Sequence, residues 1–225
     1  MVVFFASIML VFFGIVLPCA TVLFPWLKQF QPSCALPRTR RPKVVHIGMP
    51  RTCSTSLSAA LERCGYRTWH SPPMSHARGL ANWASKFDAL TDLWSTCARD
   101  YQELFAFFPG DTLFVLTVRD PHRWLRSTKT YRALAKVARW VPGYGHMERM
   151  VDQLTTDRFV RYNEEVQAFF AEQGASNRLL VMNIEAGDGW DALCPFLGVH
   201  VRQESFPKTR ELVFHVRQSF RYPCP

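Results

Sequence analysis

The sequence predicts an α/β fold, in which helices flank a central parallel sheet, preceded by one N-terminal transmembrane helix. Along residues 44–225, short runs that are apolar throughout alternate with segments whose apolar residues recur at helical spacing. Strands buried on both faces read as continuous apolar runs, and their alternation with helices is typical of a parallel sheet covered on both sides. The transmembrane helix is predicted because residues 1–27 carry no Lys, Arg, Asp or Glu.

The composition suits one compact domain and excludes a disordered chain or a collagen-like repeat. Of the 225 residues, 48% are hydrophobic and 20% are charged. The formal net charge is +9, but residues 28–43 hold five bases and no acid, which leaves 22 bases against 18 acids in residues 44–225. No nucleic-acid partner is expected from that distribution. The seven cysteines form no C-x-x-C pair, so we expect no metal site and no dense disulfide framework.

Residues 2–27 are predicted to be a membrane anchor. These 26 uncharged residues exceed the about 20 that span a bilayer core, and Trp26 fits an interfacial position. The alternatives are a cleaved signal peptide, which usually has a basic start and a shorter apolar run of about 7–15 residues, and a buried core helix. Residues 28–43, with three prolines, are interpreted as a basic linker, and residues 44–225 as the folded domain. By the positive-inside rule, the basic cluster favours the cytosolic side for this domain.

The elements of the domain follow from apolar pattern and from Gly and Pro punctuation. The first strand ends at Gly48 and Pro50, and the helix after it stops at Gly65. Four strands are expected, at residues 44–48, 66–70, 113–118 and 179–184. Helices are expected at residues 54–65, 100–108, 122–140, 147–173 and 190–197.

The loop from Gly48 to Thr55 is a candidate anion site. It follows the first strand and enters a helix, and in parallel sheets ligands bind at such carboxyl ends, where helix N–H groups favour an anion. A Walker A motif is excluded because Ser54 stands at its Lys position and Cys53 at its second Gly position, which disfavours a nucleotide kinase. The alternative is that the hydroxyl residues only cap the helix.

A second candidate anion contact lies at the end of the strand at residues 113–118. Arg119 follows that strand, and Ser127 stands eight residues later, about two helical turns on. Both side chains can therefore converge on one phosphate. The alternative is that Arg119 forms a salt bridge with its neighbour Asp120.

Taken in order, these segments resemble the sulfotransferase superfamily, in the branch with the loop pattern G-x-x-R-[TS]-G-[TS]-[TS]-S-L. The resemblance covers about 160 residues and implies a P-loop NTPase-like sulfotransferase fold and an enzyme that uses 3′-phosphoadenosine 5′-phosphosulfate as sulfuryl donor without a metal. Its segments are GMPRTCSTSL (48–57), ALERCGY (60–66), FDALTDLW (87–94), LTVRDPHRWLRS (116–127), NEEV (163–166) and EAGDGWDALCPFLGV (185–199).

The resemblance also implies roles for particular residues. The first loop would hold the 5′-phosphosulfate, and Arg119 and Ser127 would hold the 3′-phosphate. Arg51 would in addition neutralise the charge that develops on the bridging oxygen, and Trp124 would serve packing. The loop residues concerned are Arg51, Thr52, Cys53, Ser54 and Thr55.

The acceptor needs a general base, and Asp92 is the first candidate. It lies between the two anion loops, where related enzymes place a His, Glu or Asp, and an apolar pocket with Trp94 would raise its pKa. His70, at the end of the second strand, is the rival base or a substrate-binding residue. The third possibility is that neither Asp92 nor His70 is the general base and that Asp92 is a helix cap or a surface carboxylate.

Two departures from the family pattern leave an alternative function open. Cys53 replaces the loop glycine, which costs roughly 1–2 kcal/mol if that position needs a positive φ, and Arg210 stands where an Asn is frequent. The alternative is a catalytically impaired, membrane-anchored nucleotide- or partner-binding protein. The expected acceptor is a hydroxyl or amine of a small molecule or glycan, with residues 70–95 and 128–160 shaping its pocket. Anchored members of the superfamily are often Golgi proteins that face the lumen, so the side of the membrane stays open.

Overall fold

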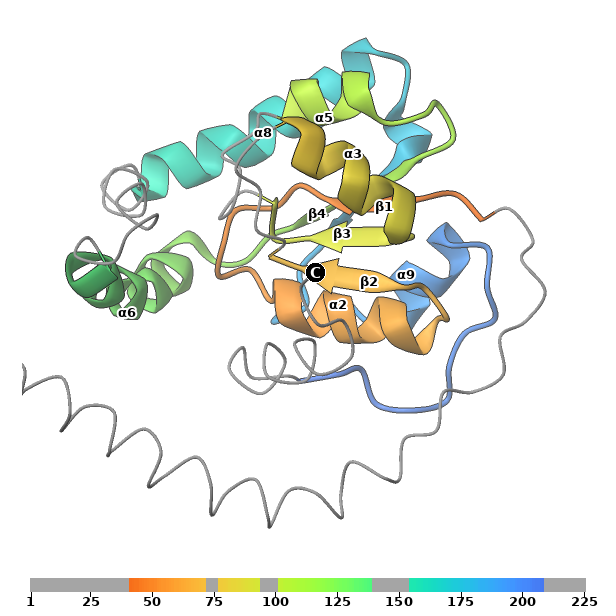
Figure 1. Ribbon diagram of the computed structural model, residues 1–225. Coiled ribbons are helices and arrows are strands. Elements are labelled where there is room, and N and C mark those ends of the chain that lie inside the picture. The colour runs from red at the N-terminus through yellow and green to blue at the C-terminus, as the bar shows by residue number, and fades with distance from the viewer. Residues whose placement is uncertain (1–40, 72–76, 94–100, 139–153, 209–225) are drawn as a thin grey trace, which may run out of the picture. The chain divides into compact units, whose positions relative to one another are not determined.

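The computed structural model describes residues 41–71, 77–93, 101–138 and 154–208 (Figure 1). Contacts along the chain divide it into two units, Met1–Arg41 and Pro42–Pro225, and the description below concerns the second. The predicted anchor at residues 1–27 and the linker as far as residue 40 lie outside the described residues. Within the described ranges, no helix is both long enough and apolar enough to cross a membrane.

The described core is one parallel sheet with helices on both faces, as the sequence predicts. Five strands lie in the order β2-β3-β1-β4-β5, and every pair is parallel. The strands are β1 (Val44–His46), β2 (Thr68–His70), β3 (Ala89–Thr91), β4 (Leu113–Thr117) and β5 (Leu179–Met182). The helices are α2 (Ser54–Arg63), α3 (Ala77–Lys86), α5 (Tyr101–Phe107), α6 (Pro121–Ala138), α8 (Thr156–Glu172) and α9 (Trp190–Phe196), with a 3-10 turn at Ser176–Arg178.

Two apolar cores cover the two faces of the sheet. Helices α3, α5 and α8 lie on one face, and α2 and α9 lie on the other (Figure 1). Because successive side chains of a strand point to opposite faces, Val45 joins the first core while Val44 joins the second. Phe114 and Val115 divide in the same way. Burial on both sides explains why these strands read as continuous apolar runs.

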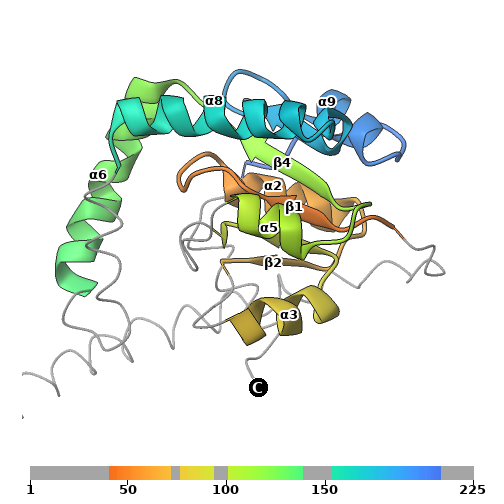
Figure 2. The ribbon, with the colours of Figure 1, turned by 90° about the horizontal axis from the view of Figure 1, so that it is seen from above.

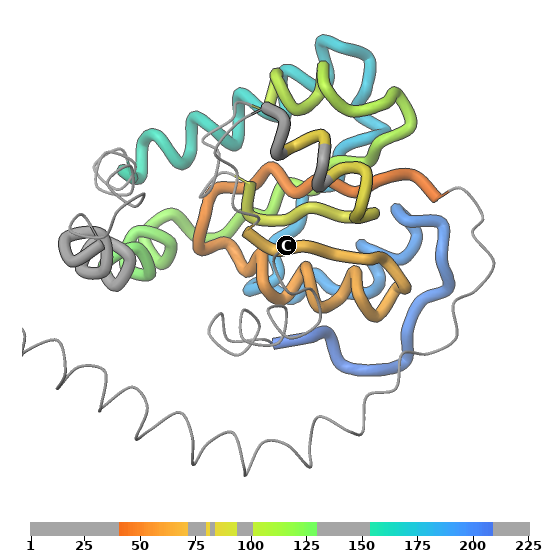
Figure 3. Tube along the Cα trace, viewed as in Figure 1, coloured from red at the N-terminus to blue at the C-terminus, as the bar shows by residue number. Residues whose placement is uncertain are grey.

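The chain changes direction across the sheet at β1. It passes from β1 through α2 to the edge strand β2, returns to β3, and then crosses to β4 and β5 on the other side of β1 (Figure 3). Loops that leave neighbouring strands in opposite directions open a crevice at the carboxyl end of the sheet. The loop after β1 and the loop after β4 border that point.

Helix α6 begins directly after β4 and packs against the first part of α8 (Figure 2). The indole of Trp124 is fully buried and stacks on Phe159, with ring centroids 4.3 Å apart. Helix α8 begins at Thr156, because the Thr155 side chain caps it by accepting a hydrogen bond from Arg158 N at 3.2 Å. The helix predicted at 147–173 therefore starts later within the described residues, and its first part, 147–153, lies outside them.

The sequence analysis missed β3 and α3. Strand β3 is three residues long and stands inside the segment FDALTDLW, which offers no apolar run of strand length. It is a strand because β2 and β1 flank it and pair with it on both sides. The sheet therefore has five described strands where the sequence predicts four, and the additional strand places Asp92 at the carboxyl edge of the sheet.

Candidate functional site

Each strand of the sheet carries a polar or charged group at or just beyond its carboxyl end. Because parallel strands end at the same edge, these groups line one side of the sheet in strand order. In the order β2-β3-β1-β4-β5, they are His70, Asp92, the loop of residues 48–53, Arg119 and Glu185.

The loop after β1 turns sharply onto the start of α2. Arg51 and Cys53 have φ angles of 69° and 68°, both in the left-handed region that favours glycine. A Cβ on Gly48 would lie 2.7 Å from both His46 Nε2 and Thr117 Oγ1, so only glycine fits there. The first turn of α2, all of it described, holds no acidic residue, so the positive end of the helix dipole is not offset by acid in that turn.

The hydroxyl residues of the loop have different surroundings. Ser54 and Thr55 are buried in the first turn of α2. The Thr52 hydroxyl donates to Met49 O at 2.6 Å and lies 2.6 Å from Thr117 Oγ1. The Thr52 side chain therefore serves the loop itself, and a ligand contact of Thr52 is left to its main chain.

Two aromatic side chains hold the loop from outside. Trp124 Nε1 donates to Pro50 O at 2.8 Å, and the Tyr162 hydroxyl donates to Ile47 O at 2.6 Å. Trp124 thus has the expected packing role and a hydrogen bond in addition. Tyr162 was missed, because nothing in the sequence connects an α8 residue with a loop 115 positions away.

Arg119 connects the two anion loops. Its Nη1 donates to Arg51 O at 2.8 Å and to Ser127 Oγ at 3.3 Å. The Ser127 hydroxyl in turn donates to Trp124 O at 2.7 Å. The side chains of Arg119 and Ser127 therefore meet, while their convergence on a phosphate stays a prediction, and the guanidinium also contacts the loop after β1.

The ion-pair partner of Arg119 is Glu185, beyond the end of β5, and the predicted alternative of Asp120 is wrong. Asp120 instead accepts a hydrogen bond from Arg123 N at 2.8 Å at the start of α6. Glu185 lies 66 positions from Arg119 in sequence, so no local pattern reveals the pair. Among the described residues, none is a hydrogen-bond partner for the buried Nε of Arg119. That atom is available to an acceptor from outside the chain.

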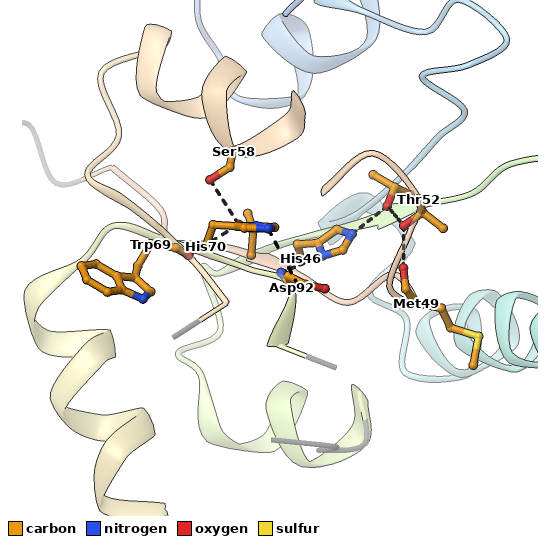
Figure 4. Close-up of polar contacts among 9 residues, drawn as sticks. His46, Met49, Thr52, Ser58, Trp69, His70 and Asp92 are labelled. Carbon is orange, nitrogen blue, oxygen red and sulfur yellow. Dashed lines mark hydrogen bonds and ion pairs between the residues drawn. The ribbon is translucent and has the colours of Figure 1, made fainter. Parts of the chain in front are cut away.

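The two candidate bases lie side by side. His70 and Asp92 are 2% and 4% exposed, and His70 Nε2 lies 3.9 Å from Asp92 Oδ2 (Figure 4). The interpretation of Asp92 as a surface carboxylate is therefore wrong. His70 Nδ1 is 3.0 Å from Thr91 Oγ1, which fixes the ring. Trp94, expected beside Asp92, lies outside the described residues.

The charges around the loop act on Cys53. Burial raises the pKa of its thiol, the Glu185 carboxylate raises it further, and the guanidinium groups of Arg119 and Arg51 oppose them. The thiol therefore stays protonated at neutral pH. In the part of the chain that the structure describes, no three His, Cys, Asp or Glu residues form a metal-binding group.

A family model described as "Sulfotransferase domain" matches residues 43–212. A search of curated proteins finds no significant match. Among solved structures, the chain resembles the crystal structure of a sulfotransferase from Alicyclobacillus acidocaldarius, with 14% identity and a TM-score of 0.49 over 81% of this chain and 91% of that one.

Proposed function

The chain belongs to the family of sulfotransferase domains, and on that premise we propose that it transfers a sulfuryl group from 3′-phosphoadenosine 5′-phosphosulfate to a hydroxyl or amine. The acceptor in this proposal is a small molecule or a glycan. The observation that carries the proposal is the guanidinium of Arg119, which bonds both to the Arg51 carbonyl and to Ser127. One cation thereby links two loops suited to the two anionic ends of such a donor.

The residues at the sheet edge fit this donor. The buried Nε of Arg119 has no partner among the described residues and suits a phosphate oxygen. In this proposal Arg119 and Ser127 hold the 3′-phosphate. The 5′ end is held by the loop and the start of α2, through Arg51, the main chain of Thr52 and Cys53, Ser54 and Thr55.

When bound, the donor supplies an activated sulfuryl group on a phosphate leaving group. Charge stabilisation and positioning dominate transfers of this kind. Arg51 places its positive charge near the bridging oxygen of the leaving group. The pair of Asp92 and His70 takes the proton from the acceptor hydroxyl or amine, a contribution of typically 10²–10⁴-fold. Their separation of 3.9 Å lets the charge of one stabilise the charge of the other.

The proposal is tested with the full-length protein in detergent. Calorimetric titration with adenosine 3′,5′-bisphosphate measures donor-site binding, and incubation with donor labelled on sulfur measures transfer to sugars, phenols, steroids, amines and tyrosine peptides. We expect binding of the bisphosphate and transfer to at least one acceptor class. Absence of both contradicts the proposal.

A second candidate function is a catalytically impaired protein that keeps the site for nucleotide or partner binding. Two observations favour it: Cys53 occupies a left-handed position with φ 68°, and Glu185 already pairs with the guanidinium of Arg119. Bisphosphate binding without transfer, together with transfer by the Cys53→Gly variant, supports this second function. Transfer by the wild type rejects it.

We further propose that residues 2–27 anchor the chain as a single-pass membrane protein, that residues 28–43 form a linker, and that residues 44–225 form the catalytic domain. The support is the uncharged stretch of 26 residues followed by five bases. An endomembrane such as the Golgi is the proposed location. Carbonate extraction tests the anchoring, and protease protection of microsomes determines the side on which the domain lies.

A further inference from the structure

A continuous chain of hydrogen bonds joins the base side of the site to the donor loop (Figure 4). Asp92 N donates to His46 Nδ1 at 3.1 Å, and His46 Nε2 lies 2.7 Å from Thr117 Oγ1. Thr117 Oγ1 lies 2.6 Å from Thr52 Oγ1, and the Thr52 hydroxyl donates to Met49 O at 2.6 Å. The chain crosses β3, β1, β4 and the loop after β1. We call these four bonds the His46 relay.

The direction of every bond in the relay is fixed by its two ends. A main-chain N–H can only donate and a main-chain carbonyl can only accept. His46 Nδ1 is therefore the acceptor, and its Nε2 carries the proton and donates to Thr117. The Thr117 hydroxyl then donates to Thr52, whose own proton goes to Met49 O. Each hydroxyl makes one donated and one accepted bond.

His46 is held in the neutral state that this pattern requires. Its side chain has no exposed surface, and burial lowers its pKa from 6.5 to about 3. Gly48 packs directly on the relay, because a Cβ there would lie 2.7 Å from both His46 Nε2 and Thr117 Oγ1. The path of the loop is thus set against the relay itself.

We propose that His46 is a positioning residue, which fixes the donor loop and Asp92 relative to each other through its two ring nitrogens. This inference rests on the proposed function. His46 contacts neither reacting group, but it sets the distance between the loop and the base, and misplacement by about 1 Å can cost 100-fold in rate. His46 thereby holds the loop that binds the sulfuryl donor and the base Asp92 in a fixed position relative to each other.

Two amide substitutions separate the two sides of the relay, namely the bond from His46 to Asp92 and the bond from His46 to Thr117. His46→Asn keeps an acceptor at the position of Nδ1 and removes the bond to Thr117. His46→Gln keeps a donor at the position of Nε2 and removes the bond to Asp92. We expect His46→Asn to weaken adenosine 3′,5′-bisphosphate binding and raise the donor KM about tenfold, the cost of one buried hydrogen bond. We expect His46→Gln to lower kcat about tenfold, with bisphosphate affinity within about twofold of wild type.

Thr117→Val removes the hydroxyl that joins His46 to Thr52, and so tests the loop side of the relay without changing His46 itself. It should reproduce the bisphosphate defect of His46→Asn, and the double variant should bind no more weakly than either single variant. The matched control is Thr112→Val, because Thr112 is equally buried and lies just before the opposite end of β4. The Thr112→Val control should leave bisphosphate affinity and kcat unchanged.

The result that overturns the inference is a uniform one. If both His46 variants lower kcat and donor affinity by the same factor, or if Thr117→Val and His46→Asn are additive, then His46 only stabilises the fold. A His46 variant that fails to fold leaves the decision to Thr117→Val. Wild-type protein that neither binds the bisphosphate nor transfers a sulfuryl group overturns the proposed function and this inference together. Active wild-type protein with a uniform result for the variants overturns this inference alone.

Discussion

The Nη1 of Arg119 donates to the main-chain carbonyl of Arg51 at 2.8 Å, so the guanidinium beyond β4 fastens the loop that follows β1. The same nitrogen reaches Ser127 on α6, and Nη2 pairs with Glu185 beyond β5. A single side chain therefore contacts the helix that follows it and two loops that lie 68 and 66 positions away in sequence. The proposed anion site depends on that side chain for its shape as well as for its charge.

Replacing Arg119 with Ala should weaken binding of adenosine 3′,5′-bisphosphate by roughly 1.5–3 kcal/mol, the usual contribution of a charge-assisted hydrogen bond. The loss should be largest at low salt, because the interaction is ionic. Isothermal titration at two salt concentrations measures both effects. Arg161→Ala is the control, since Arg161 is an exposed arginine on α8. Equal affinities of wild type and Arg119→Ala would show that the bisphosphate does not contact this guanidinium.

Replacing Cys53 with Gly should stabilise the protein by about 1 kcal/mol and strengthen bisphosphate binding. Cys53 has φ 68°, which costs a side chain with a Cβ roughly 1–2 kcal/mol and costs glycine little. Urea unfolding measures the stability, and titration measures the affinity. Cys53→Ala removes the sulfur but keeps the Cβ, so it should show no such gain. An equal gain in Cys53→Ala would assign the effect to the sulfur instead.

Replacing Glu185 with Gln should raise the affinity for the bisphosphate severalfold. The carboxylate competes with an incoming phosphate for the Arg119 guanidinium, and the neutral amide competes less. The matched control is Glu204→Gln, because Glu204 pairs with Arg63 and Arg202, away from the carboxyl edge of the sheet. Weaker binding by Glu185→Gln would mean that Glu185 orients Arg119 for its ligand.

Replacing Asp92 with Asn should lower kcat by about 10²–10⁴-fold while bisphosphate affinity changes little, because a base acts on the acceptor. The acidic limb of the pH–rate profile should disappear with it. Asp88→Asn is the control, since Asp88 pairs with Arg67 at the opposite end of β3. A larger loss of kcat in His70→Asn than in Asp92→Asn would transfer the role of base to His70.

The stability of the protein should fall with acid because of His46. Its pKa is about 3 in the folded protein and 6.5 in a model peptide, so the unfolded chain binds a proton first as pH falls. Above pH 6.5, His46 is neutral in both states and does not lower the free energy of unfolding. Between pH 6.5 and pH 3, the free energy of unfolding falls by about 1.4 kcal/mol per pH unit. Urea unfolding at pH 7 and 5 measures it, and His46→Asn should show a shallower decline. Equal slopes would mean that His46 is not buried in its neutral form.

The parallel α/β core and the boundaries of most described elements were predicted from sequence. These predictions succeed where the cause is local, because strands buried on both faces need apolar side chains throughout. The contact between Arg119 and Ser127 is of the same kind, because helix geometry fixes positions eight residues apart. Anion binding by the loops after β1 and β4 stays a prediction. The roles of the individual loop residues stay predictions.

The failures arise where the cause is distant. Strand β3 exists because two other strands pair with it, and its three residues carry no strand signal of their own. The pairing of Glu185 with Arg119 and the hydrogen bond from Tyr162 to the loop join residues 66 and 115 positions apart. Likewise, no local pattern names the partners of His46, which are Thr117 and the main chain of Asp92.

By itself, the sequence determined that this chain forms a parallel α/β sheet with small, hydroxyl and basic residues in the loops at one edge, because periodicity and residue placement are local properties. The tertiary structure alone decided which side chains meet there. It brought the candidate bases His70 and Asp92 to adjacent strand ends, turned the Thr52 hydroxyl toward its own loop, and connected Asp92 to the loop after β1 through His46. The order of strands in the sheet sets these neighbours, and that order depends on contacts between segments distant in the chain.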